Sequence, residues 1–120
     1  MIQKEKIAPN GPEFSKIILG LWRLDDVSIS ALERLIKVAS DHGVSTIDQA
    51  DIYGNYKSQE YFGKLLKANP KLRNNMQLVS KAGIHLGGSK FSKSGIGFHD
   101  TSIKHLLESV NNALKCSAFR

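Results

Sequence analysis

The segment Val44-Ser45-Thr46-Ile47-Asp48-Gln49-Ala50-Asp51-Ile52-Tyr53-Gly54 decides the fold of this chain. It begins with a short, β-branched and apolar run over residues 44–48, which predicts a buried strand. It then passes through Asp48 into a polar loop that carries Tyr53. Helical patterns precede and follow this segment, so it predicts one strand of a parallel α/β sheet.

Two further apolar runs extend the alternation of strands and helices in both directions. Residues 16–21 and residues 76–82 each predict a buried strand, because both runs are short and apolar and turn-prone residues precede the first. A hairpin is also expected over residues 2–7. The order strand, helix, strand, helix, strand, helix is typical of a parallel α/β sheet, which binds ligands at the carboxyl ends of its strands.

Three helices are predicted between and after these strands. Ser30 and Glu33 form a capping-box pattern that opens the first helix, which ends at Gly43. Ser58 is expected to cap the second helix, which ends before Pro70. The third helix begins near residue 100. The expected core faces are Leu32, Leu35, Ile36 and Ala39 in the first helix, Tyr61, Phe62, Leu65 and Leu66 in the second, and Ile103, Leu106, Leu107, Val110 and Leu114 in the third.

A glycine-rich segment over residues 83–99 predicts a long exposed loop, since it contains five glycines and three serines. Its beginning resembles a phosphate-binding loop, but Ser89 separates the last glycine from Lys90, and such a loop needs lysine directly after that glycine. His85 and His99 are expected to be solvated, because a metal site needs three or four ligands. The sequence therefore predicts neither a nucleotide hydrolase nor a metal site.

Composition excludes several classes of protein. The 120 residues are 41% hydrophobic, which suits one domain with a core. The net charge of +6 comes from scattered basic residues that do not alternate with aromatic ones, so nucleic acid binding is not expected. No apolar run approaches the roughly 18 residues that span a bilayer, and residues 1–6 lack a signal-peptide core, so a cytoplasmic location without a membrane partner is expected. Cys116 is the only cysteine, which excludes an internal disulfide.

Asp48, Tyr53 and Lys81 are the strongest candidates for a reactive site. Asp48 and Lys81 each end a predicted strand, where parallel strands bring side chains to one edge of the sheet. Each residue also has an ordinary interpretation. Asp48 could cap the following turn, Tyr53 could be a loop aromatic, and Lys81 could be a solvated charge.

Several segments resemble the aldo/keto reductase superfamily, and in particular its bacterial oxidoreductases. The matching segments are Ile18-Leu-Gly-Leu-Trp22, Thr46-Ile-Asp-Gln-Ala-Asp-Ile-Tyr-Gly54, Lys57-Ser-Gln-Glu60, Val79-Ser-Lys81 and Asp100-Thr-Ser102. They occur in family order and cover residues 7–114. The resemblance implies a (β/α)8 TIM barrel that binds NADP(H) and reduces an aldehyde or ketone, so the expected partner is a small carbonyl substrate.

The resemblance also implies a role for each candidate residue. Tyr53 would be the general acid. A free tyrosine has a pKa of about 10, so a positive charge from Lys81 would help it to release its proton, and Asp48 would hold the ammonium group. Gly20, Leu21, Trp22 and Asp48 would contact the nicotinamide end of the cofactor. Alternatively, Gly20 and Leu21 only pack in their strand, and Trp22 only caps the barrel mouth.

The barrel implied by the resemblance is longer than this chain. Three β/α units would form its first third, because such a barrel typically takes about 250 residues. Residues 1–120 are therefore expected to be a partial reductase domain, with residues 115–120 departing from the family pattern.

The resemblance further implies a histidine at the end of a fourth strand, which none of His42, His85, His99 and His105 supplies. A premature stop, a frameshift and a deliberately shortened chain are all open explanations. The alternative function is an inactive remnant that associates with itself through the unfilled edges of its incomplete barrel. The apolar stripe of the third helix is a further candidate for a partner-binding face.

Overall fold

The computed structural model describes residues 1–24 and 26–117 of the chain. Residues 118–120, which belong to the expected tail, lie outside the described residues. The described elements are, in chain order, β1 (Lys4–Lys6), β2 (Glu13–Ser15), β3 (Ile18–Gly20), α1 (Ile29–Asp41), β4 (Thr46–Asp48), α2 (Ser58–Ala68), α3 (Pro70–Asn74), β5 (Gln77–Val79), β6 (Ile84–His85), β7 (Phe98–His99) and α4 (Ile103–Cys116).

A parallel sheet in the order β3-β4-β5 forms the centre of the structure and confirms the three predicted strands. Only β4 is largely buried, so the predicted burial is wrong for β3, which is mostly exposed, and for β5, which is half-buried. Its register pairs Leu19 with Ile47 and Ile47 with Leu78. This row of apolar side chains faces the helices, where Ile47 belongs to the main core cluster and the other two pack against it. Because side chains alternate along a strand, the next row, Gly20, Asp48 and Val79, faces the opposite side.

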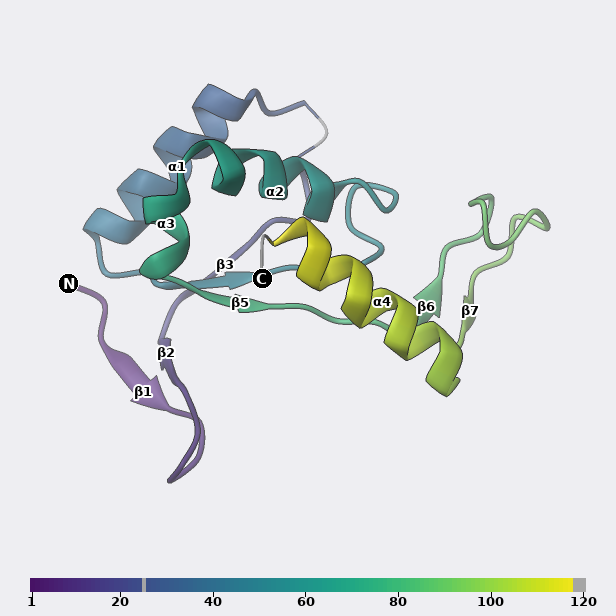
Figure 1. Ribbon diagram of the computed structural model, residues 1–120, viewed down its shortest axis with the longest axis horizontal. Coiled ribbons are helices and arrows are strands. Elements are labelled where there is room, and N and C mark those ends of the chain that lie inside the picture. Colours follow the sequence, from purple (N-terminus) through teal and green to yellow (C-terminus); the bar gives the residue numbers. More distant parts are fainter. Residues whose placement is uncertain (25, 118–120) are drawn as a thin grey trace.

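The helices lie on one side of this sheet, as Figure 1 shows for α1, α2 and α3. Leu32 and Ile36 of α1 and Phe62, Leu65 and Leu66 of α2 are buried in the core, as predicted. On the other side, the side chain of Ile18 is 45% exposed. None of the described helices is long and apolar enough to cross a bilayer.

The starts of the first two helices differ from the predictions. The N-cap of α1 is Ser28, whose Oγ accepts a hydrogen bond from the backbone N of Ala31 at 3.2 Å. Ser28 has the extended backbone that this position requires, whereas Ser30 already lies inside the helix, so the predicted capping box is wrong. The N-cap of α2 is Lys57 without a side-chain cap bond, so the predicted cap at Ser58 is also wrong.

The end of α2 and the start of α4 agree with the predictions from the sequence. Asn69 ends α2, and Pro70 begins the short helix α3, because proline is well suited to the first position of a helix. Ser102 caps α4 by accepting a hydrogen bond from the backbone N of His105 at 3.3 Å. The predicted third helix is therefore confirmed.

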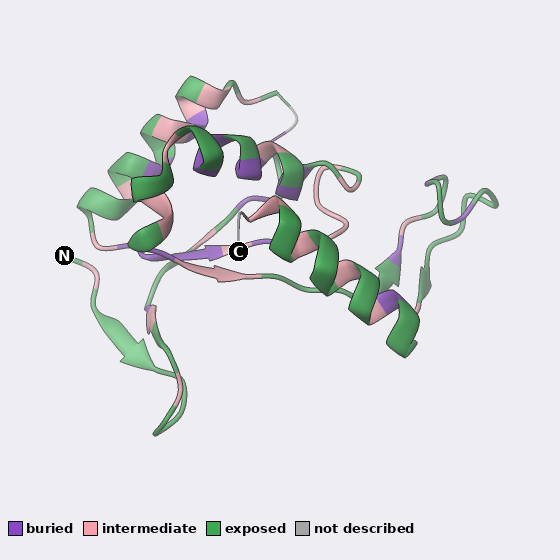
Figure 2. Cartoon of the chain, viewed as in Figure 1, coloured by how far each residue is buried: buried purple, intermediate pink, exposed green. Residues whose placement is uncertain are grey.

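Part of the expected core is exposed. Leu35 of α1 is exposed, so its assignment to the core face is wrong. Most of the apolar stripe on α4 is also exposed, as the green side of this helix in Figure 2 illustrates. The reason is that α4 contacts the rest of the described chain mainly through α2, which leaves Ile103, Leu107, Val110 and Leu114 without a covering element.

An N-terminal hairpin is present as the antiparallel pair β1 and β2, but only β1 lies within the expected residues 2–7, because the chain turns back later than expected to form β2. Ser15, at the end of β2, connects this hairpin to the start of β4. Its backbone N donates to Thr46 Oγ1 at 3.0 Å, and its Oγ accepts from the backbone N of Thr46 at 3.0 Å. The hairpin therefore contacts the end of the sheet opposite to Asp48.

Residues 83–99 are more ordered than the predicted loop, because β6 and β7 form a short antiparallel hairpin. The side chain of His85 is buried against two aromatic rings, with centroid distances of 4.9 Å to Phe91 and 4.7 Å to Phe98. The expectation that His85 is solvated is therefore wrong. His99 is exposed, as expected.

Candidate functional site

Asp48 and Lys81 approach each other because β4 and β5 are neighbours in the parallel sheet. Asp48 is the last residue of β4 and pairs with Val79, the last residue of β5. Lys81 follows Val79 by two residues and so extends to the same face of the sheet. The Lys81 ammonium donates a hydrogen bond to Asp48 Oδ1, forming an ion pair.

Tyr53 joins this pair from the loop after β4. Its hydroxyl donates a hydrogen bond to Asp48 Oδ2 at 3.1 Å, and the Lys81 Nζ lies 5.0 Å from the centre of its ring. The three residues that the sequence singled out are thus brought together around one carboxylate. The site is open to solvent, since the side chains of Asp48 and Lys81 are 27% and 49% exposed.

The carboxylate determines the charge state of the lysine. Burial acts to lower the pKa of Lys81, but hydrogen bonds and charge interactions with Asp48 and Tyr53 outweigh this effect and raise its pKa above the ordinary value. Lys81 therefore carries a full positive charge at neutral pH. This charge lies beside the phenol, where it would stabilise negative charge left on the oxygen after proton release.

The loop that carries Tyr53 is attached to β5 by backbone hydrogen bonds. The backbone N of Gln49 donates to Val79 O at 2.8 Å, and that of Asp51 donates to Lys81 O at 3.0 Å. The loop then turns sharply through Gly54, Asn55 and Tyr56, whose φ angles are 56°, 50° and 68°. Left-handed conformations are uncommon for residues other than glycine, so the positions of Asn55 and Tyr56 require support from their surroundings.

Tyr56 receives such support from the β6–β7 hairpin. Its hydroxyl accepts a hydrogen bond from the backbone N of Leu86 at 2.8 Å, and its ring packs edge-on against Phe91 at 5.0 Å between centroids. This contact connects the Tyr53 loop to the hairpin. Residue type alone could not have indicated it, because the two segments are 30 residues apart.

Ser58 is a supporting residue whose role the sequence did not reveal. Its Oγ lies 2.9 Å from the carbonyl oxygen of Leu21 and 3.0 Å from Gln49 Oε1. The side chain is buried and joins the first turn of α2 to the ends of β3 and β4. It therefore helps to position both sides of the candidate site.

The predicted cofactor-binding residues fall into two groups. Gly20 and Trp22 border open space: a Cβ on Gly20 would meet no atom within 4 Å, and Trp22 is 64% exposed. The Trp22 ring stacks beside that of Tyr53, with centroids 6.1 Å apart. Leu21 instead has a buried side chain within the core, and its backbone N donates to Asp48 O at 3.0 Å, which favours packing as its role.

The sequence comparisons support the resemblance that these residues carry. Residues 16–115 match the model of the aldo/keto reductase family. The chain is 41% identical over 117 residues to oxidoreductase YdhF of Escherichia coli, which covers 95% of this chain and 38% of that protein. It is 35% identical over 106 residues to a 6-dehydroglucose reductase of Agrobacterium fabrum, covering 86% of this chain and 36% of that protein.

The fold also agrees with a solved structure. A Pseudomonas aeruginosa protein assigned to the aldo-keto reductases superposes with a TM-score of 0.78 at 26% identity, over 96% of this chain and 42% of that one. The chain thus spans less than half the length of the relatives it matches, and its three parallel β/α units correspond to the N-terminal portion of their (β/α)8 barrel. On this combined agreement of sequence and fold, the chain belongs to the aldo/keto reductase family.

Proposed function

We propose that this chain contributes the proton-donating part of an NADP(H)-dependent carbonyl reductase, with an aldehyde or ketone as substrate. The observation that carries this proposal is the cluster in which Tyr53 and Lys81 both bind the carboxylate of Asp48. Tyr53 is the proton donor, Lys81 stabilises the charge that remains, and Asp48 holds the lysine in position. A cytoplasmic location remains a prediction of the sequence.

The open face beside Tyr53 is compatible with a flat nicotinamide ring. Gly20 leaves space free above its strand, and the exposed ring of Trp22 forms an apolar wall next to the phenol. Gly20, Trp22 and Asp48 are therefore the residues of this chain that would hold that end of the cofactor, and Leu21 would contribute only through packing. When bound, NADPH supplies the hydride for the carbonyl carbon.

Tyr53 completes the reduction by giving its hydroxyl proton to the carbonyl oxygen, so that the carbonyl becomes an alcohol and the phenol becomes a phenolate. To do this, the hydroxyl turns away from Asp48 Oδ2, its acceptor in this structure. The neighbouring ammonium of Lys81 stabilises the phenolate. Solvent can then return a proton, because the site is open.

The relatives support a carbonyl compound as the substrate class. The A. fabrum protein is named for the reduction of 6-dehydroglucose, which carries a carbonyl group at a sugar carbon. We extend only the reaction class, carbonyl reduction, to this chain.

Two measurements test the proposal. The first is NADPH binding by the 120-residue chain, followed by NADPH consumption with a simple aromatic aldehyde. The second uses a chimera in which this chain replaces the aligned 36% of the A. fabrum reductase. We expect the chimera to reduce 6-dehydroglucose and its Tyr53→Phe variant to be inactive. A folded chimera that binds NADPH but has equal activity with and without the Tyr53 hydroxyl would refute the assignment.

The exposed stripe of α4 supports a second candidate function, which is self-association. Ile103, Leu107, Val110 and Leu114 are all exposed, and a pocket of about 420 Å³ lies between α4, α2 and the end of β5. Exposed apolar patches of this kind mark interaction surfaces. Sedimentation velocity tests this function: we expect a dimer or larger species for the chain and a monomer for Leu107→Glu. A chain that is monomeric throughout would exclude it.

A further inference from the structure

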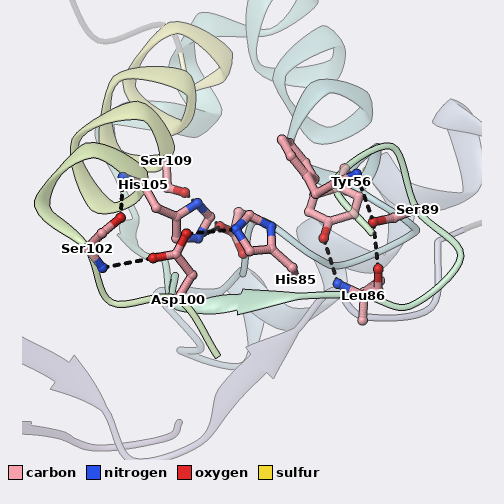
Figure 3. Close-up of polar contacts among 10 residues, drawn as sticks. Tyr56, His85, Leu86, Ser89, Asp100, Ser102, His105 and Ser109 are labelled. Carbon is pink, nitrogen blue, oxygen red and sulfur yellow. Dashed lines mark hydrogen bonds and ion pairs between the residues drawn. The ribbon is translucent and has the colours of Figure 1, made fainter. Parts of the chain in front are cut away.

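Three side chains from separate elements meet beside the β6–β7 hairpin, outside the candidate reductase site. His85 is the last residue of β6, Asp100 directly follows β7, and His105 lies in the first turn of α4. Figure 3 shows the carboxylate of Asp100 pointing toward the ring of His85, with the ring of His105 beside them. The backbone holds this arrangement, because the N of Asp100 donates to Gly83 O at 3.0 Å.

The distances within this cluster suit a common ligand. One nitrogen of each histidine and one oxygen of Asp100 all lie within 4.8 Å of one another. In a tetrahedral site with metal–ligand bonds of 2.0–2.1 Å, ligand atoms are separated by about 3.3 Å. The pair His85 Nε2 and Asp100 Oδ2 is already at 3.0 Å. Small rotations of the side chains would bring the third ligand into range.

Burial makes the cluster unusual for histidines that are only structural. His85 and His105 are 6% and 7% exposed, and their rings lie 4.3 Å apart between centroids. His85 Nδ1 and His105 Nε2 are both buried without a hydrogen-bond partner among the described residues. Buried polar atoms are normally satisfied, so the unpaired His105 Nε2 beside the His85–Asp100 pair indicates a missing ligand.

The surroundings orient the candidate ligands in the way that metal sites require. Asp100 Oδ1 accepts from the backbone N of Ser102 at 2.9 Å, which leaves Oδ2 directed at His85. Asp51 Oδ2 lies 3.7 Å from His105 Nε2 and accepts from Ser109 Oγ at 2.8 Å. The Ser102 bond thus fixes the carboxylate of Asp100, and Asp51 places a second negative charge near His105 Nε2, which favours a bound cation.

A purely structural role explains less of this arrangement. A hydrogen bond between His85 and Asp100 would suffice to attach the hairpin to the start of α4. It would leave no purpose for a second buried imidazole in contact with the first. It would also leave the buried His105 Nε2 unexplained.

We propose that His85, Asp100 and His105 form a binding site for a divalent transition-metal ion, with Zn²⁺ as the ion that best suits two imidazoles and one carboxylate. Three protein ligands leave a fourth position for water. Mg²⁺ and Ca²⁺ are disfavoured because they prefer oxygen ligands. The ion joins the β6–β7 hairpin to α4. It thereby stabilises the hydrogen bond between the Leu86 backbone and Tyr56, which connects the hairpin to the loop that carries Tyr53.

Titration calorimetry of the 120-residue chain with Zn²⁺ and, separately, Mg²⁺ tests this site. A Cys116→Ser background removes the single thiol as a competing ligand. We expect one Zn²⁺ per chain, no binding of Mg²⁺, and affinity reduced by at least about tenfold in His85→Gln and in His105→Gln. The matched control is His99→Gln, which changes an exposed histidine next to Asp100 and should bind Zn²⁺ like the parent chain.

A second measurement on the parent chain covers the case in which these variants fail to fold. The chain has four histidines, so NMR of their ring nitrogens resolves which of them respond to Zn²⁺. We expect shifts at His85 and His105 and none at His42 and His99. An absence of Zn²⁺ binding, an unchanged affinity in a folded His105→Gln variant, or shifts confined to the exposed histidines would overturn the proposal.

Discussion

The hydroxyl of Tyr53 donates a hydrogen bond of 3.1 Å to Asp48 Oδ2, across the turn that follows β4. The other oxygen of the same carboxylate binds the ammonium of Lys81. One aspartate therefore sets the positions of a proton donor and of the cation that would stabilise its anion. This geometry predicts separate effects for substitutions at Tyr53 and at Lys81.

Replacing Tyr53 with Phe should abolish carbonyl reduction and leave cofactor binding nearly intact, since only the phenolic hydroxyl is lost. General acids typically contribute about 10² to 10⁴-fold to a rate, so a loss of that size is expected. NADPH consumption by the chimera and NADPH binding by fluorescence measure the two effects. A parallel loss of binding would contradict the role of Tyr53 as a proton donor.

The variant Lys81→Met should also reduce turnover strongly, by about 10²-fold or more, because it removes the charge beside the phenol. The methionine is similar in length to lysine, so packing near Trp22 and Tyr53 should be preserved. The kcat of the chimera is the relevant measurement, with circular dichroism to verify folding. Wild-type kcat in this variant would show that the ammonium has no catalytic role.

Gly63 permits close contact between α2 and α4, and we expect Gly63→Ala to destabilise the fold. A Cβ at this position would lie 2.1 Å from the carbonyl oxygen of Cys116. Overpacking of this kind costs about 1–3 kcal/mol, although alanine ordinarily stabilises a helix relative to glycine. Urea denaturation measures the change. Gly20→Ala is the control, because a Cβ there would meet no atom within 4 Å.

Stability should fall in acid as Asp100 becomes protonated. Hydrogen bonds from the backbone and side chain of Ser102, and then from His85, lower the pKa of Asp100 from 3.8 to about 2. Because the pKa is lower in the folded state, its stabilising contribution is complete above pH 3.8 and is lost as pH falls through about 2.

The measurement is the free energy of unfolding as a function of pH, in metal-free buffer. We expect the decline between pH 3.8 and about 2 to be shallower in Asp100→Asn than in the parent chain. Identical slopes in the two proteins would show that Asp100 has the same pKa in the folded and unfolded states.

Local patterns were sufficient to predict most of the elements. The β-branched run before Asp48 forms β4, and the helical spacing of Leu32 and Ile36 correctly predicted the buried side of α1. Both signals depend only on residues a few positions apart in the sequence. The prediction of the first helix cap failed because two nearby residues could take the same role. Ser28 and Ser30 both suit an N-cap, and only the path of the chain into α1 selects Ser28.

The sequence alone determined the alternating order of strands and helices and the family, and it singled out Asp48, Tyr53 and Lys81, which meet around one carboxylate. Tertiary structure decided which distant groups meet: the Ser58 hydroxyl with the carbonyl of Leu21, 37 residues away, and His85 with Asp100, 15 residues away. The physical reason is that periodicity reports which face of an element is apolar. The pairing of individual polar groups depends instead on how folded elements close on one another, and a buried histidine has the same sequence signature as a solvated one.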